Sequence, residues 1–291
     1  MSGQLYLLPC PISEAPALDA LPASTVETAR RIDHFLVEAA RTARATLKAM
    51  GHPKPIAELD IVEIGHDPAP ELISEWLQPV LDGADAAVLS ESGCPGVADP
   101  GAQIAARAHE LGICVVPLTG PSSILLTLMA SGLDGQRFRF SGYLPKHDAE
   151  RRAAILAAEK ASRASETQLF IETPYRNTAL LDALLETLAP DTRLTVAIDV
   201  TGQNESIRTL TAAAWKAIPK AMRTLPKLPT VFAFLAKPGN RAPRYAPECA
   251  GGKRAHTAPS SKPAVLNNRP KQAFNTHRPE GSPVKTLKGG R

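Results

Sequence analysis

The stretch FIETPYRN (170–177) carries side chains that could take part in chemistry. An apolar run ends at Glu172, Arg176 follows four residues later, and Tyr175 lies between them. A carboxylate can take a proton from a reacting hydroxyl, and a guanidinium can hold an anionic group. Charged residues at strand ends are more often simply solvated, and this structural role is the alternative. The spacing predicts a catalytic or binding pair at the mouth of a cleft.

A second stretch, SESGCPGVADPG (90–101), is rich in glycine and proline and separates an apolar run from a helical pattern. Gly93 and Gly96 allow positive φ angles or a close approach of backbone to a ligand. Asp99 is suited to cap the helix, with Pro100 in its first position. Capping does not account for the small residues before it. Because ligands bind at the carboxyl ends of strands in α/β sheets, we expect one along this turn.

A third stretch, TGPSS (119–123), follows the next expected strand. Ser122 or Ser123 can cap the apolar helix after it, and a helix N-terminus can also hold a carboxylate. Capping alone is the more common role of such serines. The dinucleotide pattern GxGxxG and the phosphate-loop pattern GxxxxGK[ST] are both absent, which argues against the commonest nucleotide sites.

These stretches need strands and helices to position them. In the first half, short apolar runs alternate with helical patterns, which predicts a parallel sheet. The expected strands are 5–9, 34–38, 60–65, 86–90 and 113–118. A capping box formed by Ser24 and Glu27 predicts one helix start, and 70–81 reads as a single helix.

The second half has a different rhythm. Residues 133–145 interrupt the alternation and are interpreted as a hinge. The expected strands beyond it are 167–172, 193–199, part of 206–215, and 229–236, with helices between them, which indicates a mixed sheet. We therefore predict an α/β protein with domains at 1–118 and 119–237 and the site in the cleft between them.

Charge is divided unevenly along the chain. The sequence has 33 Lys and Arg against 29 Asp and Glu, but residues 238–291 alone contain 11 basic and 2 acidic residues. Residues 1–237 are therefore acidic, with 22 basic and 27 acidic residues. The segment 238–291 also holds 8 of the 27 prolines, which predicts a disordered basic C-terminal tail. Such a tail can bind nucleic acid, although a solvated extension without a role is more common.

Other features narrow the class of protein. The four cysteines are scattered without a CxxC or HExxH spacing, so neither a disulfide framework nor a zinc site is expected. No apolar run is long enough for a membrane span, and the first residues lack the pattern of a signal peptide. These observations predict a soluble cytoplasmic protein without a metal.

Five stretches taken in order resemble the tetrapyrrole methylase superfamily, in particular the branch that includes ribosomal RNA small-subunit methyltransferase I. They are LYLLPCPI, SGCPGVADPG, VVPLTGPSS, GYLPKHDAERR and FIETPYR, and the resemblance covers about residues 4–237. It implies two α/β/α domains, a homodimer, and a folded S-adenosylmethionine in the cleft between the domains. It also implies methyl transfer, with the ribose 2′-hydroxyl of small-subunit ribosomal RNA as the acceptor.

The resemblance assigns roles to individual residues. The residues implied to contact the cofactor are Pro9, Gly93, Cys94, Val97, Ser122, Ser123, Ala197 and Thr230. The candidate catalytic residues are Glu172, Arg176 and Glu38, of which either glutamate could take the proton of an acceptor hydroxyl. The candidate acceptor-binding residues are Arg41, Tyr175, Arg151 and Arg152. The last two belong to the densest basic run of the expected folded part, whose alternative role is a solvated helix start.

The chain departs from this branch in two segments. An AEDTR-like segment is VEAAR here, which keeps Glu38 and Arg41. An ARELTK-like segment is AIDVTG, with Ile198 and Gly202 in place of Arg and Lys. Two alternatives therefore stay open: a methyltransferase of a tetrapyrrole or other small molecule, and a catalytically weak paralogue that binds the cofactor.

Overall fold

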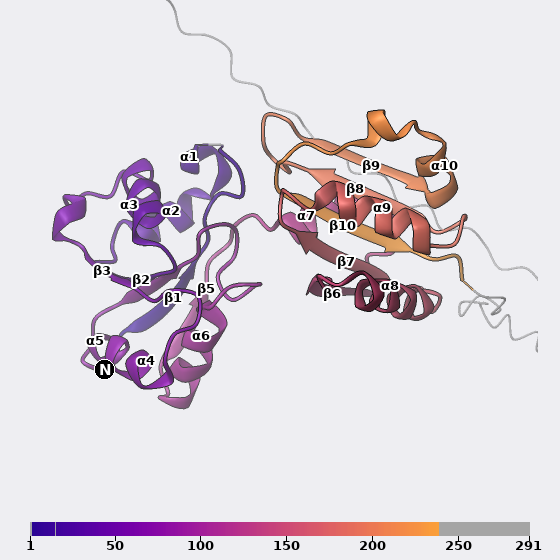
Figure 1. Cartoon of the computed structure of the whole chain (residues 1–291). Coiled ribbons are helices and arrows are strands. Elements are labelled where there is room, and N and C mark those ends of the chain that lie inside the picture. The colour runs from indigo at the N-terminus through magenta and orange to yellow at the C-terminus, as the bar shows by residue number, and fades with distance from the viewer. Residues whose placement is uncertain (1, 15, 239–291) are drawn as a thin grey trace, which may run out of the picture. The chain divides into compact units, whose positions relative to one another are not determined.

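A computed structural model describes residues 2–14 and 16–238 of the chain. The predicted basic tail, apart from its first residue, lies outside the described residues. The described part contains two five-stranded sheets (Figure 1).

The first sheet has the strand order β3-β2-β4-β1-β5, and every neighbouring pair is parallel. Its strands, in that order, are Asp60–Glu63, His34–Val37, Ala86–Leu89, Gln4–Leu8 and Cys114–Pro117. The alternation of strands and helices correctly predicted this arrangement, because parallel neighbours need a crossover connection. All five carboxyl ends therefore meet at one edge of the sheet.

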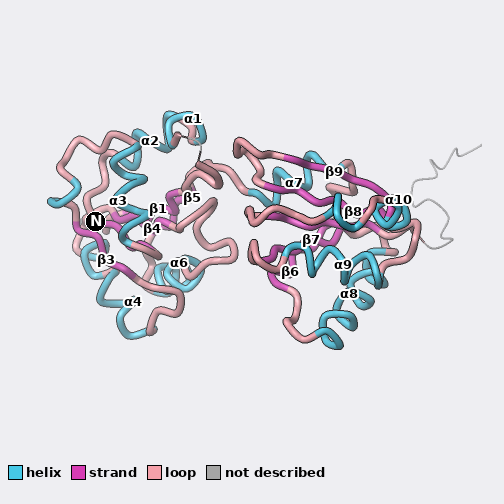
Figure 2. Tube along the Cα trace, turned by 45° about the horizontal axis from the view of Figure 1, so that its top comes forward, coloured by secondary structure: helices cyan, strands magenta, loops and turns pink. Residues whose placement is uncertain are grey.

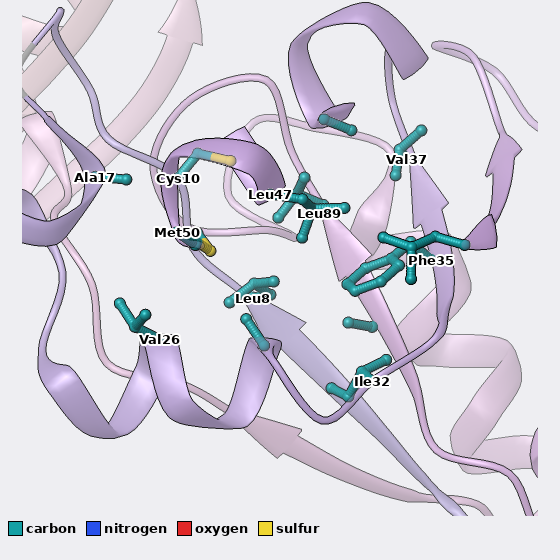
Figure 3. Packing of buried hydrophobic residues seen from close by; sticks show 14 of the residues in the cluster. Leu8, Cys10, Ala17, Val26, Ile32, Phe35, Val37, Leu47, Met50 and Leu89 are labelled. Atoms are coloured by element: carbon teal, nitrogen blue, oxygen red, sulfur yellow. The ribbon is translucent and has the colours of Figure 1, made fainter. Parts of the chain in front are cut away.

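Helices cover both faces of the first sheet (Figure 1). One face packs on α1 (Ala17–Ala20), α2 (Ala23–Ala29) and α3 (Ala40–Ala49). The other packs on α4 (Pro70–Trp76), α5 (Gln78–Leu81) and α6 (Gly101–Glu110). Successive residues of a strand point to opposite faces, so Phe35 joins the first cluster (Figure 3) and Leu36 the second.

The second sheet is mixed, as predicted, with the order β6-β7-β10-β8-β9. Its strands, in that order, are Phe138–Tyr143, Thr167–Glu172, Thr230–Leu235, Arg193–Ile198 and Ser206–Thr211. Strands β6 and β7 are parallel and the other pairs are antiparallel. Helices α8 (Asp148–Ser162), α9 (Asn177–Thr187) and α10 (Ala212–Ala217) cover one face (Figure 2), and α7 (Ser123–Ser131) packs on the other.

Three local predictions are wrong. Residues 133–145 are not a hinge but contain strand β6, whose residues are exposed or half-buried because it lies at a sheet edge. The predicted capping box does not form, since α2 begins at Ala23 after Pro22 without a side-chain cap. The helix expected over 70–81 is divided at Leu77 into α4 and α5. Pro79 lacks the N–H that a continuous helix would use.

The chain passes from the first sheet to the second between β5 and α7. Helix α7 belongs to the second sheet by packing, because Ile124 and Leu128 contact its buried face. Tertiary contacts join both sheets into one unit, Met1–Ala242. The division at residue 118 into separate domains stays a prediction. No described helix is both long and apolar enough to cross a bilayer.

Candidate functional site

The turns that follow β1 and β4 are joined by backbone hydrogen bonds. The N–H of Cys10 donates to the carbonyl of Gly93 at 2.9 Å, and the N–H of Gly93 donates back at 3.2 Å. Gly93 has a φ of 74°, and a Cβ there would lie 3.3 Å from Cγ2 of Ile12. Because β1 and β4 are parallel neighbours, the two turns meet at the carboxyl edge of the sheet, where the sequence predicted a ligand.

The turn 90–101 is held from inside by Asp99. Its Oδ1 accepts hydrogen bonds from the N–H groups of Gly96 at 2.6 Å and Gly101 at 2.8 Å. The second bond reaches Gly101, the first residue of α6, whereas the sequence predicted Asp99 as the cap of a helix that begins at Pro100. Gly96 adopts the expected positive φ, 83°. Burial raises the pKa of the Asp99 carboxyl, and the two backbone hydrogen bonds offset part of that rise.

The turn 119–123 completes this wall. Ser122 caps α7 as predicted, with its hydroxyl oxygen accepting from the N–H of Leu125 at 3.5 Å. Sγ of Cys94 donates to the carbonyl of Pro121 at 3.4 Å, which ties this turn to the preceding one. A Cβ at Gly120 would lie 2.2 Å from Cβ of Pro9, so only glycine fits between the turns as they stand.

The opposite wall is built from side chains at the ends of β7 and β10. The side chain of Glu172 is fully buried, and its Oε1 accepts from the N–H of Thr173 at 2.7 Å. An amino nitrogen of Arg176 lies 3.1 Å from Oε2 as an ion pair, although the angles do not meet those of a hydrogen bond. Glu172 and Arg176, the pair that the sequence singled out, are thus in contact.

Thr230 lies beside Glu172 because β7 and β10 are antiparallel and the two residues are register partners. Its hydroxyl accepts from Nδ2 of buried Asn177 at 2.9 Å and donates to the carbonyl of Leu228 at 3.0 Å. Nδ2 of Asn177 also donates to that carbonyl at 2.8 Å. A fixed polar network therefore supports this wall from behind.

A cavity of about 350 Å³ lies between the two walls. Four residues with a predicted cofactor or catalytic role line it, namely Val97, Ser123, Glu172 and Thr230. Glu172 is the only charged residue among the described residues of the lining. The cavity adjoins a larger one of about 620 Å³, with which it shares Ile12, Ser92 and Pro229.

The other predicted cofactor contacts are not among the residues that line the cavity. Pro9, Gly93, Cys94 and Ser122 belong to the three turns of the first wall. Ala197 is fully buried on β8, in the apolar cluster behind the cavity.

The structure does not bring Glu38 into this cavity. The carboxylate of Glu38 is 2.9 Å from Nδ1 of His66 and accepts from the N–H of Glu91 at 3.2 Å. Glu91 lines the larger cavity, so Glu38 is one contact away from it. Arg41 is exposed on α3 and lines neither cavity.

The remaining candidate acceptor-binding residues differ in how far their side chains are exposed to solvent. Tyr175 is 81% exposed. Arg152 is exposed, whereas the Arg151 guanidinium donates to the carbonyl of Lys146 at 2.9 Å and pairs with Asp148. Of the two arginines, Arg152 has its charge open to solvent, and Arg151 holds the first turn of α8.

Sequence reasoning missed several residues of the larger cavity, among them Ser13, Glu14 and Asn204. Asp199 and Thr201, also in its lining, have φ angles of 48° and 67°, a conformation that is uncommon for residues other than glycine. Oδ2 of Asp199 holds that loop by accepting from the N–H of Asn204 at 2.9 Å. No local pattern marks these positions, because the backbone conformation is imposed by the fold.

No group of three or more His, Cys, Asp or Glu side chains placed to hold a metal occurs among the described residues.

The fold and the site define a class of protein. Residues 17–215 match the family of Tetrapyrrole (Corrin/Porphyrin) Methylases, and the chain belongs to this family. Two solved structures have a similar fold, a conserved hypothetical protein from Aeropyrum pernix K1 and the methyltransferase CobJ. The first has a TM-score of 0.58 at 17% identity and covers 82% of this chain and 86% of its own. The second has a TM-score of 0.55 at 16% identity and covers 81% and 95%.

Curated relatives are more specific. The chain is 30% identical over 203 residues to "Ribosomal RNA small subunit methyltransferase I" of Bacillus subtilis (strain 168), a match that covers 70% of this chain and 65% of that protein. It is 30% identical over 205 residues to the protein of the same name from Vibrio cholerae, covering 70% and 67%. The protein of that name from Neisseria meningitidis serogroup B is 29% identical, covering 69% and 65%. The chain thus spans about 65% of the length of the first relatives that it matches.

Proposed function

We propose that this protein is an S-adenosylmethionine-dependent methyltransferase that acts on RNA, with a ribose 2′-hydroxyl of small-subunit ribosomal RNA as the acceptor. The observation that carries this proposal is the cavity of about 350 Å³, where Val97, Ser123, Glu172 and Thr230 come together. Family membership and the names of the curated relatives support it.

The residues present fit the cofactor. The volume lies within the range of small-molecule sites. One wall is backbone and small side chains, and its glycines let the turns approach each other closely, since an added Cβ would meet Ile12 at Gly93 and Pro9 at Gly120. A buried carboxylate, Glu172, is the only charge among the lining residues described, which suits a cationic sulfonium. When bound, the cofactor supplies an electrophilic methyl group.

The protein's part in such a reaction is alignment, exclusion of water and removal of a proton. Alignment rests on the fixed turns of the first wall and on the network around Asn177 in the second. Glu172 is the candidate to take the hydroxyl proton, since it is the only carboxylate among the described residues of the lining. Arg176, 3.1 Å from Oε2, holds that carboxylate in place as a positioning residue.

The cofactor part of the proposal is tested by calorimetry with S-adenosylmethionine. Gly96→Val places a branched side chain at a φ of 83° in the turn along the cavity, and we expect at least tenfold weaker binding. Gly112→Val is the matched control, because Gly112 also has a positive φ, 71°, with nothing within 4 Å of an added Cβ, and lies after α6. Equal affinity of both folded variants and the wild type would contradict a cofactor site at this turn.

The acceptor part is tested by transfer of a labelled methyl group to a cell extract separated into RNA, protein and small molecules. We expect label in RNA, at a ribose position. Label in the small-molecule fraction would favour the tetrapyrrole-type alternative, and cofactor binding without label in any fraction would favour the weak paralogue. The family resemblance also supports a homodimer in the cytoplasm, for which light scattering at micromolar concentration measures the oligomeric state.

A further inference from the structure

The two adjoining cavities carry negative charge. Glu172 lines the smaller one, and Glu14, Glu91 and Asp199 line the larger one. Neither cavity has a lysine or arginine among the described residues of its lining. An RNA acceptor brings phosphates with it, and phosphates bind where cations neutralise them. The cations that hold the RNA must therefore lie outside the cavities, at their rim.

One cation and one exposed aromatic ring occupy that rim together. Tyr175 follows Thr173 and Pro174, which line the smaller cavity. Lys227 precedes Leu228, which lines the larger one. Nζ of Lys227 lies 5.1 Å from the centroid of the Tyr175 ring, and 81% of the surface of Tyr175 is exposed. The ring of an exposed tyrosine leaves apolar surface in contact with water. A ligand that covers this ring removes that surface from water, which stabilises the complex.

Buried contacts hold the two residues next to each other although 52 positions separate them in the sequence. Asn177, which is fully buried at the start of α9, donates from Nδ2 to the carbonyl of Leu228 at 2.8 Å. On the other side, the N–H of Arg176 donates to the carbonyl of Thr173 at 2.9 Å and fixes the turn that carries Tyr175. The pair is therefore preorganised.

Nearby cations are less available than Lys227. The Arg176 guanidinium is paired with buried Glu172. Lys227 forms no ion pair with a carboxylate among the residues described, and its side chain is exposed on the ring. It can therefore contact a phosphate without breaking a salt bridge.

We propose that Tyr175 and Lys227 form the docking point for the RNA nucleotide next to the acceptor. The base stacks on the Tyr175 ring and the phosphate meets the Lys227 ammonium, so that the acceptor ribose reaches the cavity while the phosphates stay outside its carboxylates. Stacking on an aromatic ring suits single-stranded RNA and requires no particular base. This inference rests on the proposed function, since it assumes an RNA acceptor.

The test is the affinity of the full chain for a fluorescent single-stranded RNA oligonucleotide across a range of salt concentrations. We expect Tyr175→Ala to weaken binding about tenfold and Tyr175→Phe to keep nearly wild-type affinity, because the ring alone is needed. We expect Lys227→Gln to lower the slope of log affinity against log salt by about 0.7, the loss of one phosphate contact on a single strand. Lys216→Gln, an exposed lysine on α10 outside both cavity linings, is the matched control and should change neither quantity.

Measurements of cofactor affinity and of turnover distinguish a loss of RNA docking from a loss of folded, active protein. With small-subunit ribosomal RNA as acceptor, Tyr175→Ala should raise KM about tenfold with kcat and S-adenosylmethionine affinity little changed. If the wild type binds and methylates RNA but Tyr175→Ala and Lys227→Gln match it in affinity and salt slope, the docking inference is wrong and the proposed function stands. If the wild type neither binds nor methylates RNA, the acceptor part of the proposed function fails, and the inference fails with it.

Discussion

The two walls of the cavity are built by different means. The wall from the first sheet consists of turns after parallel strands, where glycine and proline bring backbone close to backbone, as at Gly120 and Pro9. The wall from the second sheet consists of buried polar side chains that are held by specific partners, Thr230 by Asn177 and Glu172 by Arg176. The first wall is fixed by close backbone packing together with hydrogen bonds to its backbone, and the second by an ion pair and hydrogen bonds between side chains. Substitutions should therefore damage them in different ways.

Each wall follows from the strand arrangement of its own sheet. Parallel strands bring turns of one kind to one edge, so β1, β4 and β5 each contribute a small-residue turn there. In the second sheet, β10 runs antiparallel to β7, so its first residue, Thr230, pairs with the last residue of β7, Glu172. The second wall is therefore assembled by the pairing of two antiparallel strands in register, whereas the first is assembled from similar turns that follow parallel strands.

The largest effect is expected from Gly120→Ala, which tests the steric wall. An added Cβ would lie 2.2 and 2.5 Å from side-chain atoms of Pro9, whose ring cannot rotate away. We expect a loss of about 2 to 3 kcal/mol in the free energy of unfolding by urea, the upper range for overpacking. Gly135→Ala is the control, since nothing lies within 4 Å of its added Cβ. Equal stability of the two variants would show that the turns yield, and the contrast between the walls would be lost.

An intermediate effect is expected from Arg176→Ala, which tests the charged wall. Removal of the guanidinium leaves the carboxylate of Glu172, whose side chain is fully buried, without its cation. Because Arg176 is partly exposed, we expect a loss of about 1 to 2 kcal/mol, less than for a fully buried pair. The double variant Arg176→Ala/Glu172→Gln should recover most of that loss, since a neutral amide needs no cation. Chemical denaturation at pH 7 measures both, and a double variant no more stable than the single one would contradict a charge-based wall.

The smallest effect concerns Asp99, whose carboxylate holds the turn 90–101 of the first wall. Burial raises its pKa, so the folded state binds a proton more tightly than the unfolded chain. That contribution is complete below the usual aspartate pKa and is lost as pH rises through the raised one. Asp99→Asn keeps an acceptor for Gly96 and Gly101 but does not titrate. Relative to this variant, we expect the wild type to lose on the order of 0.5 kcal/mol as the pH rises from below the usual aspartate pKa through the raised one, a small value because the group is partly solvated.

Urea unfolding at several pH values checks this expectation, with Asp19→Asn, an exposed aspartate on α1, as the control. An Asp99→Asn variant whose stability followed the wild type at every pH would show that the carboxylate does not contribute to the pH dependence.

Local signals were sufficient for many elements. The parallel sheet followed from the alternation of apolar runs and helices, and Ser122 caps α7 as its position predicted. Strand β6 was missed because its residues at the sheet edge do not alternate between buried and exposed positions. It forms a strand through its pairing with β7. The residue types around Glu172 indicated a site. The sequence gives no local signal that β10 pairs with β7 and so places Thr230 beside Glu172.

The sequence by itself determined the turns, because glycine, proline and short polar side chains restrict the backbone within a few residues of themselves. It also determined the contact between Glu172 and Arg176, which lie four residues apart at the two ends of the short turn between β7 and α9. The tertiary structure alone decided that Asp199 and Thr201 adopt positive φ angles, that Glu38 lies outside the smaller cavity, and that Lys227 lies beside the ring of Tyr175. Each of these depends on contacts between segments distant in sequence, whose energy appears only when the sheets have formed.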